Sequence, residues 1–242
     1  MSILDKIDEP KDLKELNINE LEILCDDIAS LIKDTIITKG GHYSSPLGVI
    51  ELTVALHYVY NSPIDKLIWD VGHQAYPHKI LTGRKNKFST LRQKNGISGF
   101  LKIDESEHDA FGAGHSSTSI SAGLGFAHAR DKDNKKHQVL SIIGDGAMTG
   151  GMAYEGMNNL GFHKTQLTVV LNDNSLSISK SVGALSKYLT FITTNRTYNK
   201  IRKNIWSISG KIPLISKSLR YLLKNVEKTL KVSLTAGSFF ED

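Results

Sequence analysis

Apolar and polar residues alternate with two different periods along most of the chain. In 19–38 and 48–61, apolar side chains recur every three or four residues, which predicts helices with one buried face. The mostly apolar runs 138–144 and 166–172 are typical of strands that are buried on both faces. Because the helical stretch 149–160 lies between these runs, the order predicts two neighbouring strands of a parallel sheet.

Three more segments extend this alternation. The mostly apolar segment 67–71 predicts a short buried strand, and 75–84 predicts the start of a helix with Pro77 in its first turn. Small residues dominate 116–130, which predicts a helix that can pack closely against a sheet or a ligand. The fold class is therefore α/β, with a parallel sheet flanked by helices.

The pattern weakens after Ser175. Only 214–232 then carries the apolar stripe of a helix. The charge changes at the same place: residues 1–180 contain 19 Lys and Arg against 22 Asp and Glu, whereas 181–242 contain 11 against 3. We therefore expect a ligand-binding domain over 1–180 and a basic linker region, partly helical and partly disordered, over 181–242.

Composition narrows the protein class. A chain of 242 residues with 40% hydrophobic and 23% charged residues can bury a core and is not of low complexity. The single cysteine, Cys25, forms no internal disulfide, which favours a reducing compartment. The acidic start has no apolar signal region, and no run of about 18 apolar residues occurs. We expect a cytoplasmic protein without a membrane partner.

The basic region also bears on nucleic-acid binding. Its Lys and Arg residues are dispersed, with no dense block and no aromatic platform on which bases could stack. We therefore expect no nucleic-acid partner and interpret 214–232 as a helix that packs on a neighbouring domain. An RNA-binding or membrane-surface helix is the alternative.

The turn 144–150 carries the clearest chemical signal. It joins a predicted strand to a predicted helix and is rich in glycine, so its backbone N–H groups suit a phosphate. Its glycine spacing is neither that of the dinucleotide fingerprint nor that of a P-loop. Asp145 lies within this turn and would repel a diphosphate unless a cation lay between them. The turn therefore predicts Mg²⁺ that bridges Asp145 and a diphosphate.

The next predicted strand supplies a partner for this aspartate. Asn174 follows Asp145 at the length of one turn, one helix and one strand, so both residues follow the carboxyl ends of parallel strands. Their side-chain oxygens could reach one metal ion, and a main-chain oxygen around Leu176 could add a third ligand. The alternative is that Asp145 only caps a helix and Asn174 only forms a turn.

These residues belong to longer segments that resemble one enzyme family. The sequence resembles the 1-deoxy-D-xylulose-5-phosphate synthases, which are thiamine-diphosphate-dependent enzymes of the transketolase-like superfamily. The segments that carry the resemblance are Gly41-His42, 52–61, 67–84, 114–125, 143–161 and 170–179. The stretches WDVGHQAYPHK and GHSSTSIS are the most specific. The resemblance implies the diphosphate-binding domain of such an enzyme.

The resemblance also assigns roles to individual residues. It implies that His42 lies at the reacting centre as a catalytic residue, engaged in proton handling or substrate contact. The residues implied to bind thiamine diphosphate and Mg²⁺ are Asp145 and Asn174 through side chains, Leu176 through its main chain, Gly146 and Ala147 at the diphosphate, and His73, Gly114, His115 and Ser116 as further cofactor contacts. His57 is expected to be structural, and His78 and His108 to be surface or packing residues.

The implied reaction condenses pyruvate with glyceraldehyde 3-phosphate and releases CO₂, giving a precursor for isoprenoids and thiamine. Complete members are implied to be homodimers and to have second and third domains that this sequence does not contain. A separate polypeptide is one possible source of those domains. Alone, the chain is expected to have little or no synthase activity.

Other functions stay open from the sequence. A transketolase-like or 2-oxoacid-dehydrogenase-like subunit would use the same metal site with another acceptor. A non-catalytic remnant or binding module would keep only the fold. Zinc at His73 and His78, or at His108 and His115, lacks a supporting framework of Cys or acidic ligands.

Overall fold

Three short parallel strands lie at the centre of residues 2–173, the part of the chain that the computed structural model describes. The strand order is β1–β2–β3 and both pairings are parallel, which confirms the predicted α/β class. The helices and strands, with η marking 3-10 or π-helical turns, are η1 (Leu4–Lys6), η2 (Pro10–Glu15), α1 (Ile18–Lys39), α2 (Ser44–Leu47), α3 (Ile50–Val59), β1 (Lys66–Trp69), α4 (Tyr76–Lys79), η3 (Ile80–Arg84), η4 (Lys85–Thr90), α5 (Ser119–Lys132), β2 (Val139–Gly144), α6 (Asp145–Met148), α7 (Gly151–His163) and β3 (Thr168–Asn172).

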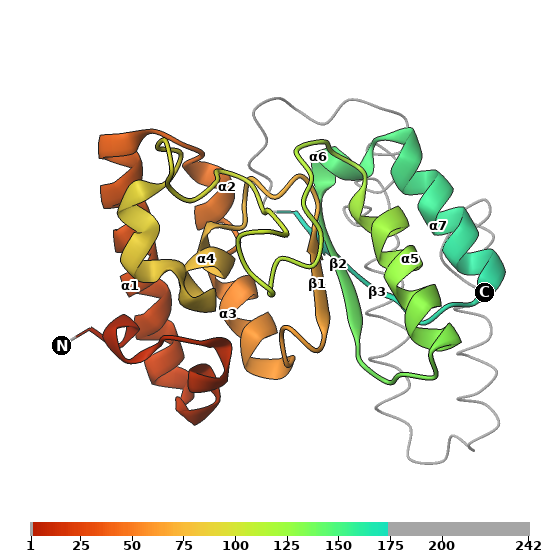
Figure 1. Cartoon of the computed structure of the whole chain (residues 1–242), viewed down its shortest axis with the longest axis horizontal. Coiled ribbons are helices and arrows are strands. Elements are labelled where there is room, and N and C mark those ends of the chain that lie inside the picture. The colour runs from red at the N-terminus through yellow and green to blue at the C-terminus, as the bar shows by residue number, and fades with distance from the viewer. Residues whose placement is uncertain (1, 174–242) are drawn as a thin grey trace, which may run out of the picture. The chain divides into compact units, whose positions relative to one another are not determined.

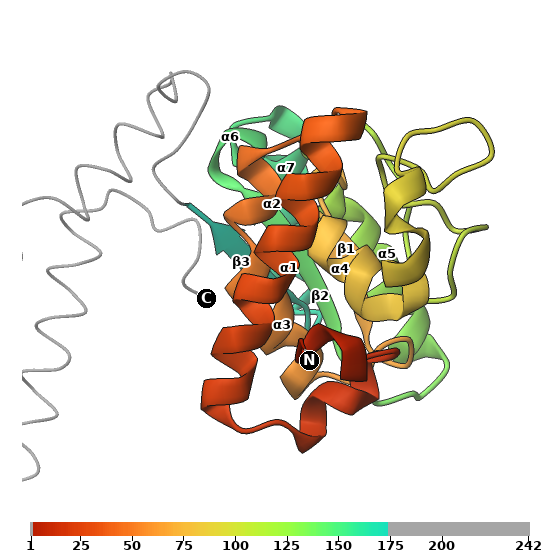
Figure 2. The same cartoon turned by 90° about the vertical axis from the view of Figure 1, so that its left-hand side faces the viewer.

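The sheet is covered on both faces. Helices α1–α4 lie on one side of the strands, and α5 and α7 lie on the other (Figure 1). In Figure 2, which looks from the first of these sides, α1 lies in front of the sheet. Successive strand residues point to opposite faces: Trp69 packs with Leu56 of α3, whereas Ile68 and Val139 pack with Ala127 of α5. This two-sided burial explains why β1 and β2 are mostly apolar. The expectation that 166–172 is buried on both faces is wrong, because no residue of β3 is fully buried and Leu171 is 47% exposed.

The pairing register brings the carboxyl ends of β2 and β3 to one edge. Trp69 pairs with Ile142, and Gly144, the last residue of β2, pairs with Asn172, the last residue of β3. The turn that begins at Asp145 therefore starts at the edge where β3 ends. This is the edge at which open parallel sheets bind ligands.

Helix α1 begins and ends within one residue of its prediction. Asn17 Oδ1 accepts a hydrogen bond from the Glu20 backbone N–H at 3.1 Å, and Glu20 Oε2 accepts one from the Asn17 N–H at 2.9 Å. This reciprocal capping box fixes the first turn. Leu24, Ile28 and Ile32 recur every four residues and are fully buried. The periodicity therefore indicated the buried face correctly.

The predicted helix 75–84 is wrong in its second half. Regular α-helix covers only Tyr76–Lys79, and the chain then kinks at Thr82, with φ −110°, and Gly83, with φ +82°. The Thr82 hydroxyl donates to the His78 carbonyl at 2.6 Å and so competes with the helical backbone pattern. Gly83 supplies the left-handed conformation that ends the helix.

The predicted helix 116–130 begins three residues late, at Ser119. Ser117 has φ +70°, a left-handed conformation that a helix does not accommodate. The backbone N–H groups of Ser117 and Ser119 both point at the Asp70 carboxylate instead of lying in a regular helical turn. Ser116, a predicted cofactor contact, therefore lies in a loop.

Several predictions fall outside residues 2–173. They are the helix 214–232, the basic region 181–242 and the metal ligands Asn174 and Leu176. Of the helices in the described part, none combines the length and the hydropathy needed to cross a membrane.

Candidate functional site

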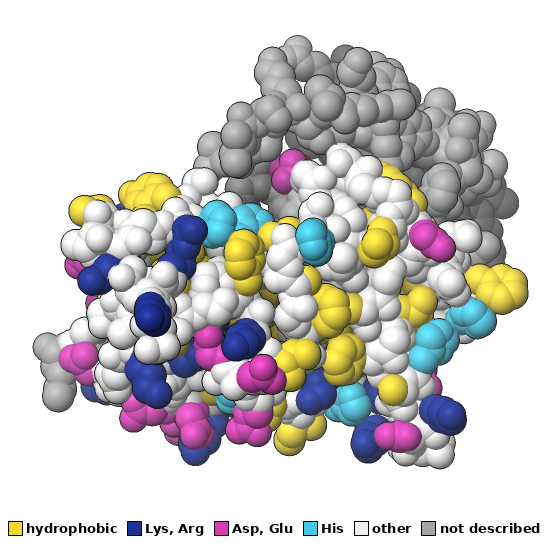
Figure 3. All heavy atoms as spheres, turned by 45° about the horizontal axis from the view of Figure 1, so that its top comes forward, with side chains coloured by type: hydrophobic (Ala, Val, Ile, Leu, Met, Phe, Trp, Pro, Cys, Tyr) yellow, Lys and Arg dark blue, Asp and Glu magenta, His cyan; other side chains and the backbone are white. Residues whose placement is uncertain are grey.

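Three loops that are far apart in the sequence meet where the strands end. They follow β1, precede α5 and follow β2. The Asp70 carboxylate, just after β1, accepts hydrogen bonds from the backbone N–H groups of Ser117 at 2.7 Å and Ser119 at 2.9 Å. The Ser117 hydroxyl then donates to the Ala147 carbonyl at 2.6 Å, in the glycine-rich turn. Figure 3 looks towards this end of the molecule and shows histidine and acidic side chains at its surface.

Asp70 is the centre of this arrangement. The residue is 1% exposed, so its charge is balanced by hydrogen bonds and not by water. Its backbone carbonyl accepts from Gly72 N at 2.6 Å and from Gln74 Nε2 at 2.9 Å, which closes a tight turn. Val71 and Gly72 both have positive φ, +61° and +88°, in this turn. The turn fixes the position of the next residue, His73.

Sequence reasoning missed Asp70. The available signal was an acidic residue that directly ends the apolar run Leu67–Trp69. An acidic side chain is almost never fully buried unless it has a partner. The partners are Ser117, in the loop before α5, and Ser119, the first residue of α5, so the run itself could not reveal them.

The glycine-rich turn leaves its backbone open. Asp145 is partly exposed and begins α6, and a Cβ placed on Gly146 would meet no atom within 4 Å. A Cβ on Gly114, in the facing loop, would likewise meet nothing within 4 Å. Gly150 differs, because a Cβ there would overlap the Ser117 hydroxyl. Gly150 therefore permits close packing of the loops, whereas Gly114 and Gly146 leave room for a ligand beside the backbone.

His42 and His73 lie side by side at the same end of the sheet. Their ring centroids are 5.3 Å apart with edge-on geometry. Burial, followed by the charge of Arg92, lowers the pKa of His42, and burial together with His42 lowers the pKa of His73. Both imidazoles are therefore neutral at pH 7. The His73 Nδ1 atom is buried and has no hydrogen-bond partner within residues 2–173.

The predicted site residues are thus partly united. His73, the Gly114–Ser116 loop and the Asp145–Ala147 turn are joined through Asp70 and Ser117, and His42 lies against His73. His115 and Ser116 are exposed. The site residues Asn174 and Leu176 follow β3 outside the described part, so only Asp145 of the predicted metal ligands has a described position.

A chain of buried polar side chains supports α4. His57 Nε2 lies 2.9 Å from His78 Nδ1, and His78 Nε2 lies 3.2 Å from Asp109 Oδ1. Arg84 donates to both Asp109 oxygens at 2.8 Å. Burial lowers the pKa of both histidines, that of His78 to about 4. Burial raises the pKa of Asp109, but hydrogen bonds from His78 and Arg84 outweigh it and hold the pKa low, so the carboxylate is ionised.

The same network anchors the loop between η4 and α5. Glu105 forms an ion pair with the fully buried Lys79 and accepts a hydrogen bond from Ser98 N at 2.7 Å. Phe100, in this loop, lies edge-on to His42 with ring centroids 5.7 Å apart. The buried charges therefore anchor the loop whose Phe100 ring packs against His42.

A cavity of about 510 Å³ opens beside this loop. Its lining includes Arg92, Phe100 and Lys102 and does not include Asp145. Neither His42 nor His73 lines the cavity, and Phe100 is the lining residue whose ring contacts His42.

His78 and His108 agree with the expectation that they are surface or packing residues. His78 is fully buried and uses both ring nitrogens in hydrogen bonds, so it is a packing residue. His108 is half-buried, with Nδ1 2.9 Å from Ser62 Oγ. Across residues 2–173, no three His, Cys, Asp or Glu side chains gather in a way that could hold a metal ion.

A parallel sheet with a glycine-rich turn and an aspartate at its strand ends is typical of α/β domains that bind ligands. Comparison with known proteins identifies the family. The family model described as 1-deoxy-D-xylulose-5-phosphate synthase, which represents the N-terminal part of those enzymes, matches residues 4–242. The chain belongs to the 1-deoxy-D-xylulose-5-phosphate synthase family, which confirms the resemblance seen in the sequence. Enzymes of this family are thiamine-diphosphate-dependent transferases.

Individual relatives agree with this assignment. The chain is 51% identical over 240 residues to the 1-deoxy-D-xylulose-5-phosphate synthase of Caldanaerobacter subterraneus subsp. tengcongensis, covering 99% of this chain and 39% of that protein. It is 51% identical over 241 residues to the synthase of Halothermothrix orenii, covering 100% and 38%. The chain therefore spans about two fifths of the length of the curated relatives it matches.

Proposed function

We propose that this chain is the cofactor-binding part of a 1-deoxy-D-xylulose-5-phosphate synthase and holds the diphosphate and Mg²⁺ of thiamine diphosphate. The observation that carries the proposal is the junction of three loops at the strand ends, fixed by Asp70 and Ser117 beside Asp145. The complete enzyme condenses pyruvate with glyceraldehyde 3-phosphate and releases CO₂. A cytoplasmic location and a homodimeric complete enzyme belong to the same proposal.

The described residues fit an anionic cofactor with a hard cation. His73 Nδ1 is a buried polar atom that lacks a partner in the described part, so a ligand atom can satisfy it. The open backbone at Gly114 and Gly146 allows close approach of a diphosphate. Asp145 offers the carboxylate oxygen that Mg²⁺ prefers. These features support a bound metal–diphosphate group.

Each site residue then has a defined task. Asp145 and Asn174 hold the metal through side-chain oxygens and Leu176 through its carbonyl. The other cofactor-binding residues are Gly146 and Ala147 at the diphosphate, and His73, Gly114, His115 and Ser116 around the remaining cofactor atoms. When bound, thiamine diphosphate supplies the carbon nucleophile and the electron sink for decarboxylation.

His42 and His73 serve the reacting side of the site. Because their pKa values are lowered, neutral imidazole predominates at pH 7, and each ring can donate one hydrogen bond and accept another. A neutral imidazole at the surface of the site binds substrate oxygens without adding charge and can take up a proton during turnover.

Calorimetric titration of thiamine diphosphate with Mg²⁺ tests the binding proposal. The wild-type chain should bind weakly, and Asp145→Asn should bind at least tenfold more weakly because it loses a charged metal ligand. Asp104→Asn is the matched control, since Asp104 is exposed and takes no part in the hydrogen bonds that join the three loops. Equal affinities for all three proteins would refute the assignment of Asp145.

Activity tests the role of the remaining domains. The purified 242-residue chain should form little or no product from pyruvate and glyceraldehyde 3-phosphate. Adding the C-terminal portion of the Halothermothrix orenii relative as a separate polypeptide should restore turnover if the chain is a functional half of the site. Cofactor binding without any restored turnover would favour a non-catalytic binding module instead.

A further inference from the structure

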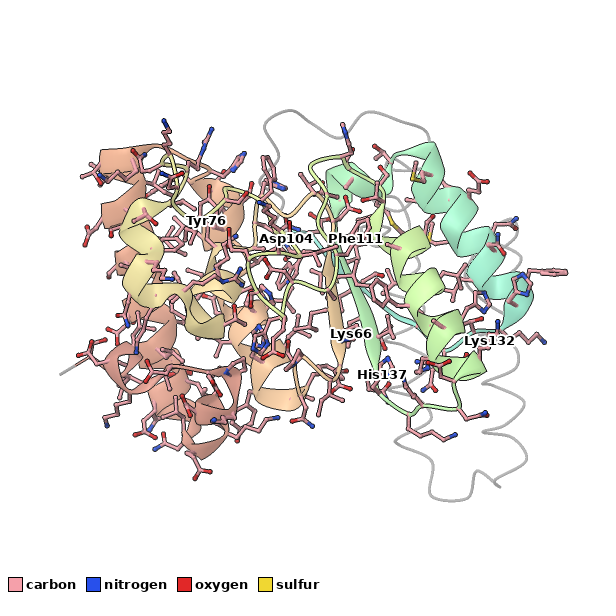
Figure 4. The ribbon with its side chains drawn as sticks, in the orientation of Figure 1. Lys66, Tyr76, Asp104, Phe111, Lys132 and His137 are labelled. Atoms are coloured by element: carbon pink, nitrogen blue, oxygen red, sulfur yellow. The ribbon has the colours of Figure 1, made fainter. Side chains whose placement is uncertain are left out.

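The Tyr76 hydroxyl is buried directly against His42. Tyr76 is fully buried, and its Oη lies 3.3 Å from the His42 backbone nitrogen and 3.4 Å from His42 Nδ1. A Cβ on Gly41 would stand 3.0 Å from the same oxygen, so the chain passes closely over the hydroxyl. In Figure 4, Tyr76 lies on the side of the sheet occupied by α1–α4. The ring is held from behind by Phe88, edge-on at 5.8 Å.

The direction of these two hydrogen bonds follows from counting hydrogens. The His42 backbone N–H can only donate, so Tyr76 Oη is the acceptor there. The hydroxyl hydrogen then needs an acceptor, and within residues 2–173 His42 Nδ1 is the one that Oη contacts. If Nδ1 carried a hydrogen, the buried hydroxyl hydrogen would have no partner, which is unfavourable. We propose that Tyr76 donates to Nδ1 and fixes His42 as the tautomer with its hydrogen on Nε2.

The tautomer determines what His42 offers to the site. Nε2 has no partner in the described part of the chain and is not among its buried unpartnered atoms, so it reaches solvent. The groups around the ring are His73, Phe100 and the positive charge of Arg92. His42 therefore presents an N–H donor in the resting state, which suits an anionic or carbonyl oxygen. Tyr76 is a positioning residue, and its contribution to the reaction rests on the proposed function.

The inference is tested by nitrogen-15 NMR of the histidine rings in the purified chain. Wild-type His42, assigned by the loss of its signals in His42→Gln, should show Nδ1 unprotonated and Nε2 protonated above its pKa. In Tyr76→Phe the preference should weaken, and the His42 pKa should rise by about 0.5–1 unit, because a donor on Nδ1 no longer opposes protonation. Tyr43→Phe, the same change at an exposed neighbouring residue, should alter neither value.

The wild-type measurement does not depend on the folding of Tyr76→Phe. A hydrogen on Nδ1 in the wild-type chain would overturn the inference, and so would a fall or no change in the His42 pKa of folded Tyr76→Phe. The fall is informative because a Tyr76 oxygen that accepted from Nδ1 would favour the protonated ring. Absence of thiamine diphosphate binding with the expected tautomer would instead refute the proposed function and leave the tautomer assignment standing.

Discussion

Asp70→Asn should loosen the junction of the three loops without changing the shape of the side chain. The wild-type carboxylate accepts from Ser117 N and Ser119 N with its two oxygens. An amide retains one acceptor and turns its NH₂ group towards the other backbone N–H. The variant therefore loses one hydrogen bond to a charged group and places two donors opposite each other.

The magnitude follows from burial and geometry. The two hydrogen bonds are 2.7 and 2.9 Å long and the residue is 1% exposed, so water cannot replace the lost bond. Hydrogen bonds to charged groups contribute about 1.5–3 kcal/mol each, and a buried unsatisfied donor costs about 1–3 kcal/mol. We expect a loss of about 2–4 kcal/mol in the free energy of unfolding, equivalent to roughly 1–2 M in the urea midpoint.

Urea unfolding followed by circular dichroism measures this loss, with Asp145→Asn as the matched variant. Asp145 is partly exposed at the start of a turn, so its amide variant should change the unfolding free energy by less than about 0.5 kcal/mol. The two variants should thus separate stability from cofactor binding. If Asp70→Asn has the same urea midpoint as the wild type, Asp70 does not stabilise the junction of the three loops. If both variants lose the same free energy of unfolding, the proposed difference between Asp70 and Asp145 is refuted.

Three further changes test the packing and the buried charges. Gly123→Ala should destabilise the chain by about 1–3 kcal/mol in thermal unfolding, because the new Cβ would overlap a serine hydroxyl of β2. In Gly125→Ala, on the same helix, the new Cβ meets no atom within 4 Å, so this control should be neutral or stabilising. As the pH falls from 6.5 to about 4, the free energy of unfolding should fall by up to about 1.4 kcal/mol per pH unit, because His78 is neutral in the folded chain and protonated in the unfolded chain. A His78→Asn variant whose free energy of unfolding has the same slope against pH would contradict this. Glu105→Gln should lower the unfolding free energy by about 2–3 kcal/mol, since it leaves the buried Lys79 without its counter-charge, and an unchanged urea midpoint would disprove that pairing.

The sheet and the position of Asp145 at the edge where the strands end could be predicted because their signals are local. Apolar runs marked the strands, and the length between Asp145 and Asn174 implied one crossover, which places both residues after neighbouring strand ends. The helix that contains Tyr76 was also located, although its kink at Gly83 was not. Period and turn composition report on neighbouring residues and therefore fix element types well.

The supports of the site could not be predicted for the opposite reason. Asp70 binds a loop 47 residues later, and Ser117, whose backbone N–H donates to Asp70, has a left-handed conformation. The buried pairing of His57 with His78 likewise joins two elements whose contact depends on the folded arrangement of α3 and α4. Such contacts arise from tertiary structure, so no local sequence pattern predicts them.

The central claim is that the loops at the strand ends hold a metal-bridged diphosphate. The most direct measurement compares three calorimetric titrations of the wild-type chain: thiamine diphosphate with Mg²⁺, thiamine diphosphate with a chelator, and thiamine with Mg²⁺. Binding should require both the diphosphate and the metal. The open glycine backbone would contact the diphosphate directly, whereas Asp145 would bind it only through a cation. Equal binding of thiamine, or binding that is indifferent to the chelator, would contradict the account.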